Sequence, residues 1–216
     1  MTCKEYRRQA HEACQPNIGK LVVITLVYAL INGLINVEYK TENLIVLIVG
    51  LVFSLVGLLI AGPLQYGYIH AIVTNYQGRV PSVENLFSGF KYIWKLLVLN
   101  LLIGIYTFLW SLLFIIPGIV KGIAYSRAIY IFYENPELSA NECIKRSQEL
   151  MDGYKGEYFL LMLSYFGWVL LSVLTFGILM LWVTPRMETA NYILYRRTKG
   201  ESEFLEENDD LDYQYE

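Results

Sequence analysis

Two long apolar runs of the same length, each with few charges, dominate this chain. Residues 96–133 and residues 158–195 each extend over 38 positions with only two charged side chains. A single helix of that length would be about 57 Å long, roughly twice the ~30 Å hydrocarbon core of a bilayer. Each run therefore predicts two membrane-spanning helices joined by a turn, with Pro117 and Gly118 at the first turn and residues 175–177 at the second.

Two further apolar segments before residue 80 complete the pattern. The predicted spans are residues 18–37, 44–73, 96–116, 118–134, 158–175 and 177–195. The expected fold is all-α, a polytopic transmembrane helical bundle of six spans arranged as three hairpins. Four spans are the alternative, if each 38-residue run forms one tilted span and a re-entrant piece. The hydrophobic content of 55% agrees with the membrane class and disfavours a soluble globular protein.

Lysine and arginine fall mostly on one side of the six predicted spans. The amino-terminal segment, the two long loops and the segment after the last span hold 13 of the 17 basic residues. Short cytoplasmic loops of membrane proteins are enriched in these residues. Both termini are therefore predicted to be cytoplasmic, with residues 1–17 as a basic cytoplasmic leader before a transmembrane domain of residues 18–199.

Acidic residues gather at the carboxyl end of the chain. Residues 201–216 contain eight acidic side chains and no basic one, although the whole chain carries a net charge of only −3. Such a segment has too few apolar side chains to bury, so residues 200–216 are predicted to be a disordered cytoplasmic tail. Docking of a basic protein partner is the functional interpretation of the same segment.

Two connectors on the predicted cytoplasmic side have the pattern of amphipathic helices. Ser139 and Glu142 fit a capping box, and apolar residues then recur on one face up to Tyr154. A looser version of the pattern begins at Pro81. We expect both connectors to pack along the membrane, and binding of a protein partner is the alternative.

The sequence holds no motif of a known catalytic or cofactor site. Patterns for a serine nucleophile elbow, a zinc protease helix, a phosphate loop and a dinucleotide fold do not occur. The only histidines are His11 and His70, and Cys3, Cys14 and Cys143 have no metal-ligand spacing. We therefore expect no enzyme activity, no cofactor and no metal. The basic loops hold too few charges to predict nucleic-acid binding.

Charges inside the predicted spans are the sharpest signal in the sequence. An ionised side chain in hydrocarbon costs about 3 kcal/mol or more unless it is paired or reaches the interface. Arg127 and Glu188 lie at matched depth, about 10 to 12 Å from the cytoplasmic helix ends, so they predict an intramembrane ion pair. A structural clamp is favoured over a substrate-sensing pair. Arg186 is a competitor for Glu188, and His70 is expected to bond a neighbour rather than relay protons.

A longer set of motifs extends over about residues 62–195. Its members are Leu86-Phe87, Gly89-Phe90, Phe114–Ile119, Tyr125-Ser126, Asn135–Glu137, Ser147, Leu150–Gly153, Lys155-Gly156, Ser164–Trp168, Leu174-Thr175, Gly177, Leu181-Trp182 and Pro185. Their order and spacing resemble a bacterial multi-pass integral membrane family, domain of unknown function 975. The resemblance implies an all-helical protein of the bacterial cell membrane and supplies no substrate or catalytic residue. Arg127 and Arg186 depart from the family pattern, which argues against a family-wide mechanism through Arg127.

Three functions are compatible with these features. The preferred hypothesis is a non-enzymatic scaffold, regulator or accessory subunit whose cytoplasmic helices or acidic tail bind a protein partner. The alternative is a transporter or export-related protein for a small solute or peptide, for which a cavity reaching Arg127, Glu188 and His70 would be the sign. The third is a membrane-embedded lipid-modifying enzyme. Membrane lipids are partners in each case, and the sequence does not indicate an oligomeric state.

Overall fold

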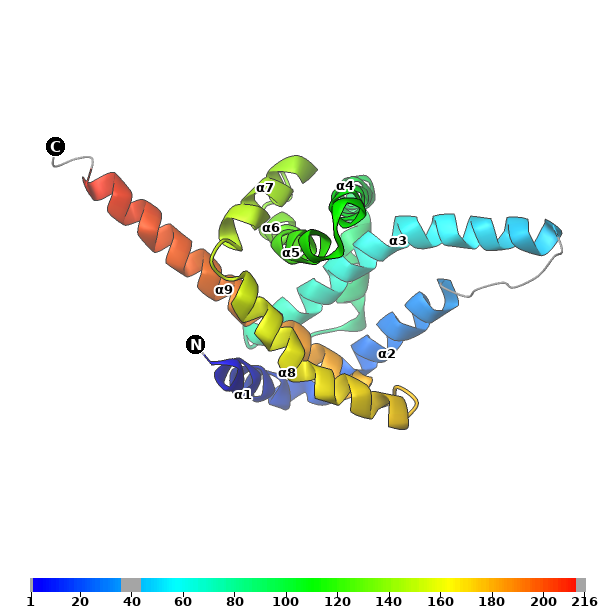
Figure 1. The fold of residues 1–216 in the computed structure, drawn as a ribbon. Helices are drawn as coiled ribbons and strands as arrows, with labels where there is room; N and C mark the ends of the chain where they lie inside the picture. Colours follow the sequence, from blue (N-terminus) through cyan, green and yellow to red (C-terminus); the bar gives the residue numbers. More distant parts are fainter. Residues whose placement is uncertain (1, 36–43, 213–216) are drawn as a thin grey trace.

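The computed structural model describes residues 2–35 and 44–212, and these residues are helical with no strand (Figure 1). The α-helices are α1 (Cys3–Cys14), α2 (Ile18–Ile35), α3 (Leu44–Tyr76), α4 (Ile93–Leu113), α5 (Ile115–Tyr125), α6 (Ala128–Glu134), α7 (Ala140–Leu150), α8 (Lys155–Leu174) and α9 (Met180–Asp212). Two 3-10 helices are η1 (Gln15–Asn17) and η2 (Val83–Tyr92). The predicted all-α class is confirmed.

Membrane-length helices are present, although not in the predicted number. The described residues hold five candidates by length and composition, namely Cys3–Gly33, Gly50–Tyr76, Val83–Leu112, Ile115–Glu134 and Lys155–Leu174. The sixth predicted span, residues 177–195, lies at the start of α9 and its turn and is not among these candidates. These helices are compatible with a membrane protein, and six spans remain a prediction.

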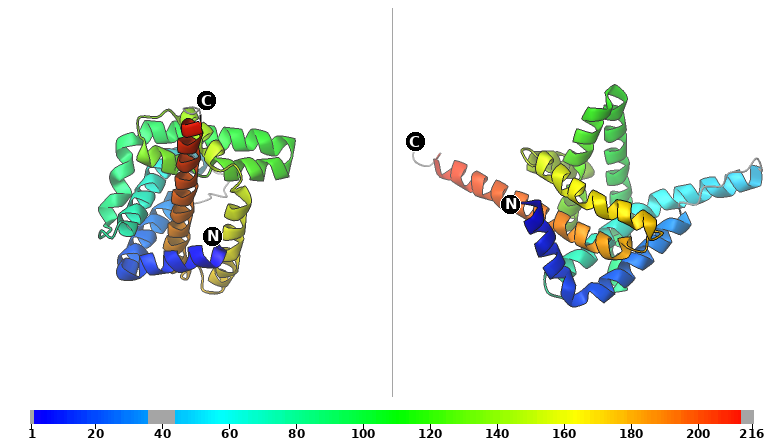
Figure 2. Two further views of the ribbon diagram at one scale, coloured as in Figure 1. Left: turned by 90° about the vertical axis from the view of Figure 1, so that its left-hand side faces the viewer. Right: turned by 60° about the horizontal axis from the view of Figure 1, so that its bottom comes forward.

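Three apolar tips extend from a common body (Figures 1 and 2). They are formed by residues 51–58 of α3, residues 114–120 at the α4–α5 connection and residues 170–178 at the α8–α9 connection. Large apolar side chains are mostly exposed there, with Ile115 at 76% and Phe176 at 98%. Exposed apolar surface of this extent is suited to lipid rather than to water.

The turn between α4 and α5 lies at Phe114, whose backbone is extended, rather than at the predicted Pro117 and Gly118. Both predicted turn residues are instead inside the first turn and a half of α5, where a proline costs little because the early backbone N–H groups have no helical partner. A Cβ atom at Gly118 would lie 2.8 Å from the Ser111 Cα of α4. Gly118 is therefore needed for close packing of α4 on α5.

The other predicted turn is where the chain changes direction between α8 and α9. Phe176 and Gly177 have positive φ values of 50° and 83°. The predicted span 118–134 is interrupted, because α5 ends at Tyr125 and α6 begins at Ala128. The turn at Phe114 and the break between α5 and α6 are both features of backbone geometry, which mean hydropathy does not report.

The body is packed around α6, α7, η2 and the carboxyl-terminal half of α3. Residues 128–132 of α6 are all buried. The 3-10 helix η2 lies directly against α3, since a Cβ atom at Gly67 would clash with the Leu86 backbone and one at Gly89 with the Pro63 backbone. This close approach fixes the second connector as part of the body.

The first connector is also structural. Ser139 and Glu142 form the predicted capping box, with the Ser139 N–H donating to Glu142 Oε2 at 2.8 Å. Cys143, Ile144 and Ser147 on the inner face of α7 are buried against the body. The inner face of this helix is therefore part of the packed body, and binding of a protein partner to its exposed face stays a prediction.

Both ends of the chain are helical within the described residues. The leader forms α1, which packs against α8 and α9. The helix α9 extends to Asp212, and a disordered cytoplasmic tail over residues 200–216 stays a prediction. The tail residues 213–216 and the turn predicted at residues 38–43, between the first two spans, lie outside the described residues.

Candidate functional site

A polar cavity of about 220 Å³ lies where α2, α3, α6, α8 and α9 approach one another. Its lining consists of Tyr28, Gln65, Tyr68, Ile69, Ser126, Arg127, Tyr130, Tyr158, Thr184, Glu188 and Asn191. Among these described residues the two charged side chains are those of Arg127 and Glu188. The structure thus brings the two principal predicted site residues to one cavity.

Arg127 is held at the break between α5 and α6. Its backbone N–H donates to Ser147 Oγ at 3.1 Å, and Ser147 Oγ donates to the Ala124 carbonyl at 2.6 Å. The side chain is only 1% exposed, and its Nη1 donates to the Asn191 carbonyl at 3.1 Å. The break in the helix and α7 together fix the position of the guanidinium.

The remaining hydrogen-bond capacity of this guanidinium is unused. Arg127 Nε and Nη2 are buried and have no hydrogen-bond partner among the described residues. The guanidinium carbon lies 4.6 Å from the Tyr158 ring centroid and 5.6 Å from that of Tyr130. Cation–π contacts contribute about 0.5 to 2 kcal/mol each, less than the cost of several kcal/mol for a buried unpaired charge. An anion is the group that would satisfy Arg127.

Glu188 lies on α9 and faces the same cavity. Its Oε2 accepts a hydrogen bond from the Tyr130 hydroxyl at 2.9 Å. No ion pair within 4.0 Å joins Arg127 to Glu188 in the part of the chain that the structure describes. Tyr130 stands between them, because its ring contacts Arg127 while its hydroxyl binds Glu188. Their predicted meeting in one place is found, and the predicted direct pair is not formed.

The two secondary candidates lie elsewhere. His70 Nδ1 is 3.0 Å from Ser88 Oγ of η2, and its ring is 5.7 Å from that of Tyr133. This agrees with the expected bond to a neighbour, and His70 does not line the cavity. Arg186 lines a different pocket beside α1, and no ion pair joins it to Glu188 among the described residues. The reason is that residues 186 and 188 point to different faces of α9.

The aromatic lining was not predicted as part of a site. Tyr28 and Tyr68 stack beside the cavity with their ring centroids 4.8 Å apart. One signal was present in the sequence. Tyr130 follows Arg127 by three residues and Asn191 follows Glu188 by three, the spacing that places side chains on one helical face.

The arrangement is suited to binding. It offers a cation with unpaired donors, a carboxylate, hydroxyl groups and an amide oxygen, Asn191 Oδ1, which is also buried without a partner. Within the described residues no group of three His, Cys, Asp or Glu side chains gathers that could hold a metal ion. The donor set therefore favours an organic ligand that carries both charged and polar groups.

One comparison with known proteins identifies a family. The family described as a protein of unknown function (DUF975) matches residues 1–121 and 112–202. No curated protein and no solved structure matches the chain. The match extends beyond residues 62–195, where the sequence motifs had suggested this resemblance.

Proposed function

The chain belongs to the DUF975 family, whose function is unknown, and we propose that it binds and translocates a small zwitterionic solute of amino-acid type across the cell membrane. The observation that carries this proposal is the buried Arg127 guanidinium, which presents unpaired Nε and Nη2 atoms at a cavity that also contains Glu188. A carboxylate can accept two parallel hydrogen bonds from such a guanidinium.

The charge arrangement favours a zwitterion over a simple anion. Tyr130 keeps the Arg127 guanidinium and the Glu188 carboxylate apart, so a solute can pair with both. Its carboxylate would bind Arg127, and its ammonium group would bind Glu188 and the faces of the tyrosine rings. At about 220 Å³ the cavity is smaller than typical pockets for drug-sized ligands, which supports a small solute.

The position of the cavity supports transport rather than scaffolding. Its lining comes from α2 and α3, from α6, and from α8 and α9, so every predicted hairpin contributes to it. Relative movement of hairpins around a central polar site is a common basis of alternating access. The proposal includes a bacterial cell membrane location with both termini cytoplasmic, as the basic loops predict.

Binding to the purified full-length protein tests the proposal. Each common L-amino acid is added to the detergent-solubilised protein, next to its amide, which lacks the carboxylate, and its N-acetyl form, which lacks the ammonium group. At about 100 times its Kd, the matching amino acid should raise Tm by about 5 to 10 °C. Stabilisation by neither the amino acids nor their derivatives, or equal stabilisation by all three forms, would overturn the zwitterion proposal.

Variants connect the effect to the cavity. Arg127→Met and Glu188→Gln should each abolish the shift in Tm, and His70→Gln should retain it because His70 lies outside the cavity. Thr184→Val changes the cavity lining without changing a charge. If the Arg127 variant does not fold, the ligand-induced shift in Tm of this variant tests the cavity instead. Uptake of the same amino acid into proteoliposomes separates transport from binding alone.

A further inference from the structure

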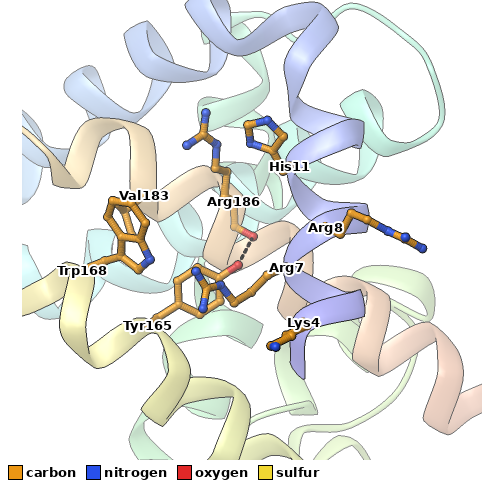
Figure 3. A pocket seen from close by; sticks show the side chains of 8 residues that line it. All are labelled: Lys4, Arg7, Arg8, His11, Tyr165, Trp168, Val183 and Arg186. Atoms are coloured by element: carbon orange, nitrogen blue, oxygen red, sulfur yellow. Dashed lines mark hydrogen bonds between the residues drawn. The ribbon is translucent and has the colours of Figure 1, made fainter. Parts of the chain in front are cut away.

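A second pocket, which we call the basic groove, lies between α1 and the α8–α9 hairpin (Figure 3). Its volume is about 440 Å³. The lining residues are Lys4, Arg7, Arg8, His11, Tyr165, Trp168, Val183 and Arg186. All the ionised side chains in this set at neutral pH are cations, and no carboxylate is among the described residues that line the groove.

The opposite face of α1 fixes these cations in place. Tyr6, Ala10 and Cys14 are fully buried against α8 and α9. The Tyr6 hydroxyl accepts a hydrogen bond from Arg197 Nη1 at 3.0 Å, and Cys14 Sγ lies 3.2 Å from Thr189 Oγ1. The basic side chains therefore belong to a docked helix rather than to a loose leader.

Protein groups satisfy these cations only in part. Arg7 Nη1 donates to the Ser164 carbonyl at the long distance of 3.5 Å, and its guanidinium carbon is 5.6 Å from the Tyr165 ring centroid. Within the part of the chain that the structure describes, the ion-pair partner of Arg8 is exposed Glu12, at 3.8 Å. Arg186 Nε is buried and has no hydrogen-bond partner in the described part of the chain. Lys4, Arg7 and Arg186 thus face one groove without an ion-pair partner among the described residues, which indicates that an anion belongs there.

We propose that the basic groove binds the phosphate headgroup of an anionic phospholipid. Basic pockets beside membrane helices attract such headgroups, by about 1 kcal/mol per lysine or arginine. The groove wall includes Trp168, which is 41% exposed, and Leu171, three residues later on the same side of α8, is 47% exposed. Acyl chains can cover this apolar surface while the phosphate contacts Arg7 and Arg186, an arrangement that a free phosphate ion would not use.

Native mass spectrometry of the full chain in a neutral detergent tests this assignment. Phosphatidylglycerol is the probe, phosphatidylcholine is the control lipid, and inorganic phosphate and glycerol 3-phosphate are soluble competitors. The pair Arg7→Gln and Arg186→Gln should weaken phosphatidylglycerol binding about 25-fold, or about fivefold per charge. The matched pair Lys145→Gln and Arg146→Gln removes two exposed charges from α7 and should change binding less than twofold.

Three other outcomes of this experiment would overturn the proposal. Equal loss of affinity in the two glutamine pairs would overturn the groove as the binding site. Displacement of the lipid by either soluble competitor at equal concentration would show a free-anion site and overturn the lipid assignment. The pair Arg7→Lys and Arg186→Lys keeps both charges, so it should retain most of the affinity; affinity as low as in the glutamine pair would indicate packing alone and also overturn the proposal.

Discussion

The polar cavity and the basic groove each contain an arginine with an unpartnered buried nitrogen, but the two surroundings differ. Arg127 lies among tyrosines with a carboxylate across the cavity. Arg186 lies beside other cations, at a pocket that adjoins exposed apolar surface of α8. The ligand that suits an arginine in a predicted span therefore depends on the charges around it. Opposite charges around it suit a zwitterion, and like charges suit an anion.

The most direct test of this difference measures the binding of both ligands to each of two arginine variants. Arg127→Gln should weaken binding of the matching amino acid at least 100-fold, because a desolvated charge partner is lost, and should leave phosphatidylglycerol binding within twofold. Arg186→Gln should do the reverse, with about a fivefold loss for the lipid. Calorimetry with the amino acid and native mass spectrometry with the lipid measure both. Loss of both ligands in either variant would mean that the two sites act as one.

Cysteine labelling compares the accessibility of α1 beside the groove with that of α7 behind the cavity. Cys143 is fully buried, and burial raises the pKa of its thiol to about 11 from an ordinary value of 9.0. At pH 7 its reactive thiolate is thus about 100-fold scarcer than at an unperturbed site. Maleimide should label Cys3, which is half-buried, and largely spare Cys143. Labelling of Cys143 should increase as the pH rises from 9 through 11; equal labelling at pH 7 would contradict a buried inner face of α7.

Salt should weaken ligand binding at the two sites to different extents. Raising the ionic strength from about 0.1 M to about 1 M shortens the Debye length from about 10 Å to about 3 Å. Lipid binding at the groove should weaken severalfold, because Arg8 and its neighbours lie at the surface. Amino-acid binding at the buried Arg127 should change less than twofold. The measurement is a titration of each ligand at both salt concentrations, and equal salt dependence would remove the distinction between an enclosed and an open site.

The support of Arg127 by α7 predicts an effect on stability rather than on ligand binding. Ser147→Ala removes the acceptor for the Arg127 N–H and a donor to the Ala124 carbonyl, so it should lower the free energy of unfolding by about 1 to 3 kcal/mol. Ser54→Ala removes only a local bond to the Gly50 carbonyl and should cost less than about 0.5 kcal/mol. Denaturation in detergent measures both. Equal effects would show that α7 does not hold the break at Arg127.

Local and periodic features of this protein could be predicted from its sequence. The helical class followed from the apolar runs, and the capping box at Ser139 followed from spacing alone. The common location of Arg127 and Glu188 followed from counting residues to the helix ends. Each of these inferences uses information contained within one segment.

Features that depend on contacts between distant segments could not be predicted in this way. Tyr130 lies between Arg127 and Glu188 because α6 places this side chain toward α9. Arg186 meets Arg7 only because the leader docks as α1 on helices more than 150 residues later. The turn at Phe114 instead of Pro117 depends on side-chain packing between α4 and α5. Hydropathy patterns contain none of these relations.

The docking of α1 on α8 and α9 has a consequence for biosynthesis. The buried face of α1 is made before its partners Leu161, Val183 and Ala190, which follow it by about 150 to 180 residues. At about 5 to 20 residues per second, α1 waits roughly 10 to 40 s for them. An amphipathic helix can rest on the membrane surface during that interval. The docking of α1 therefore has to wait until the α8–α9 hairpin has been synthesised.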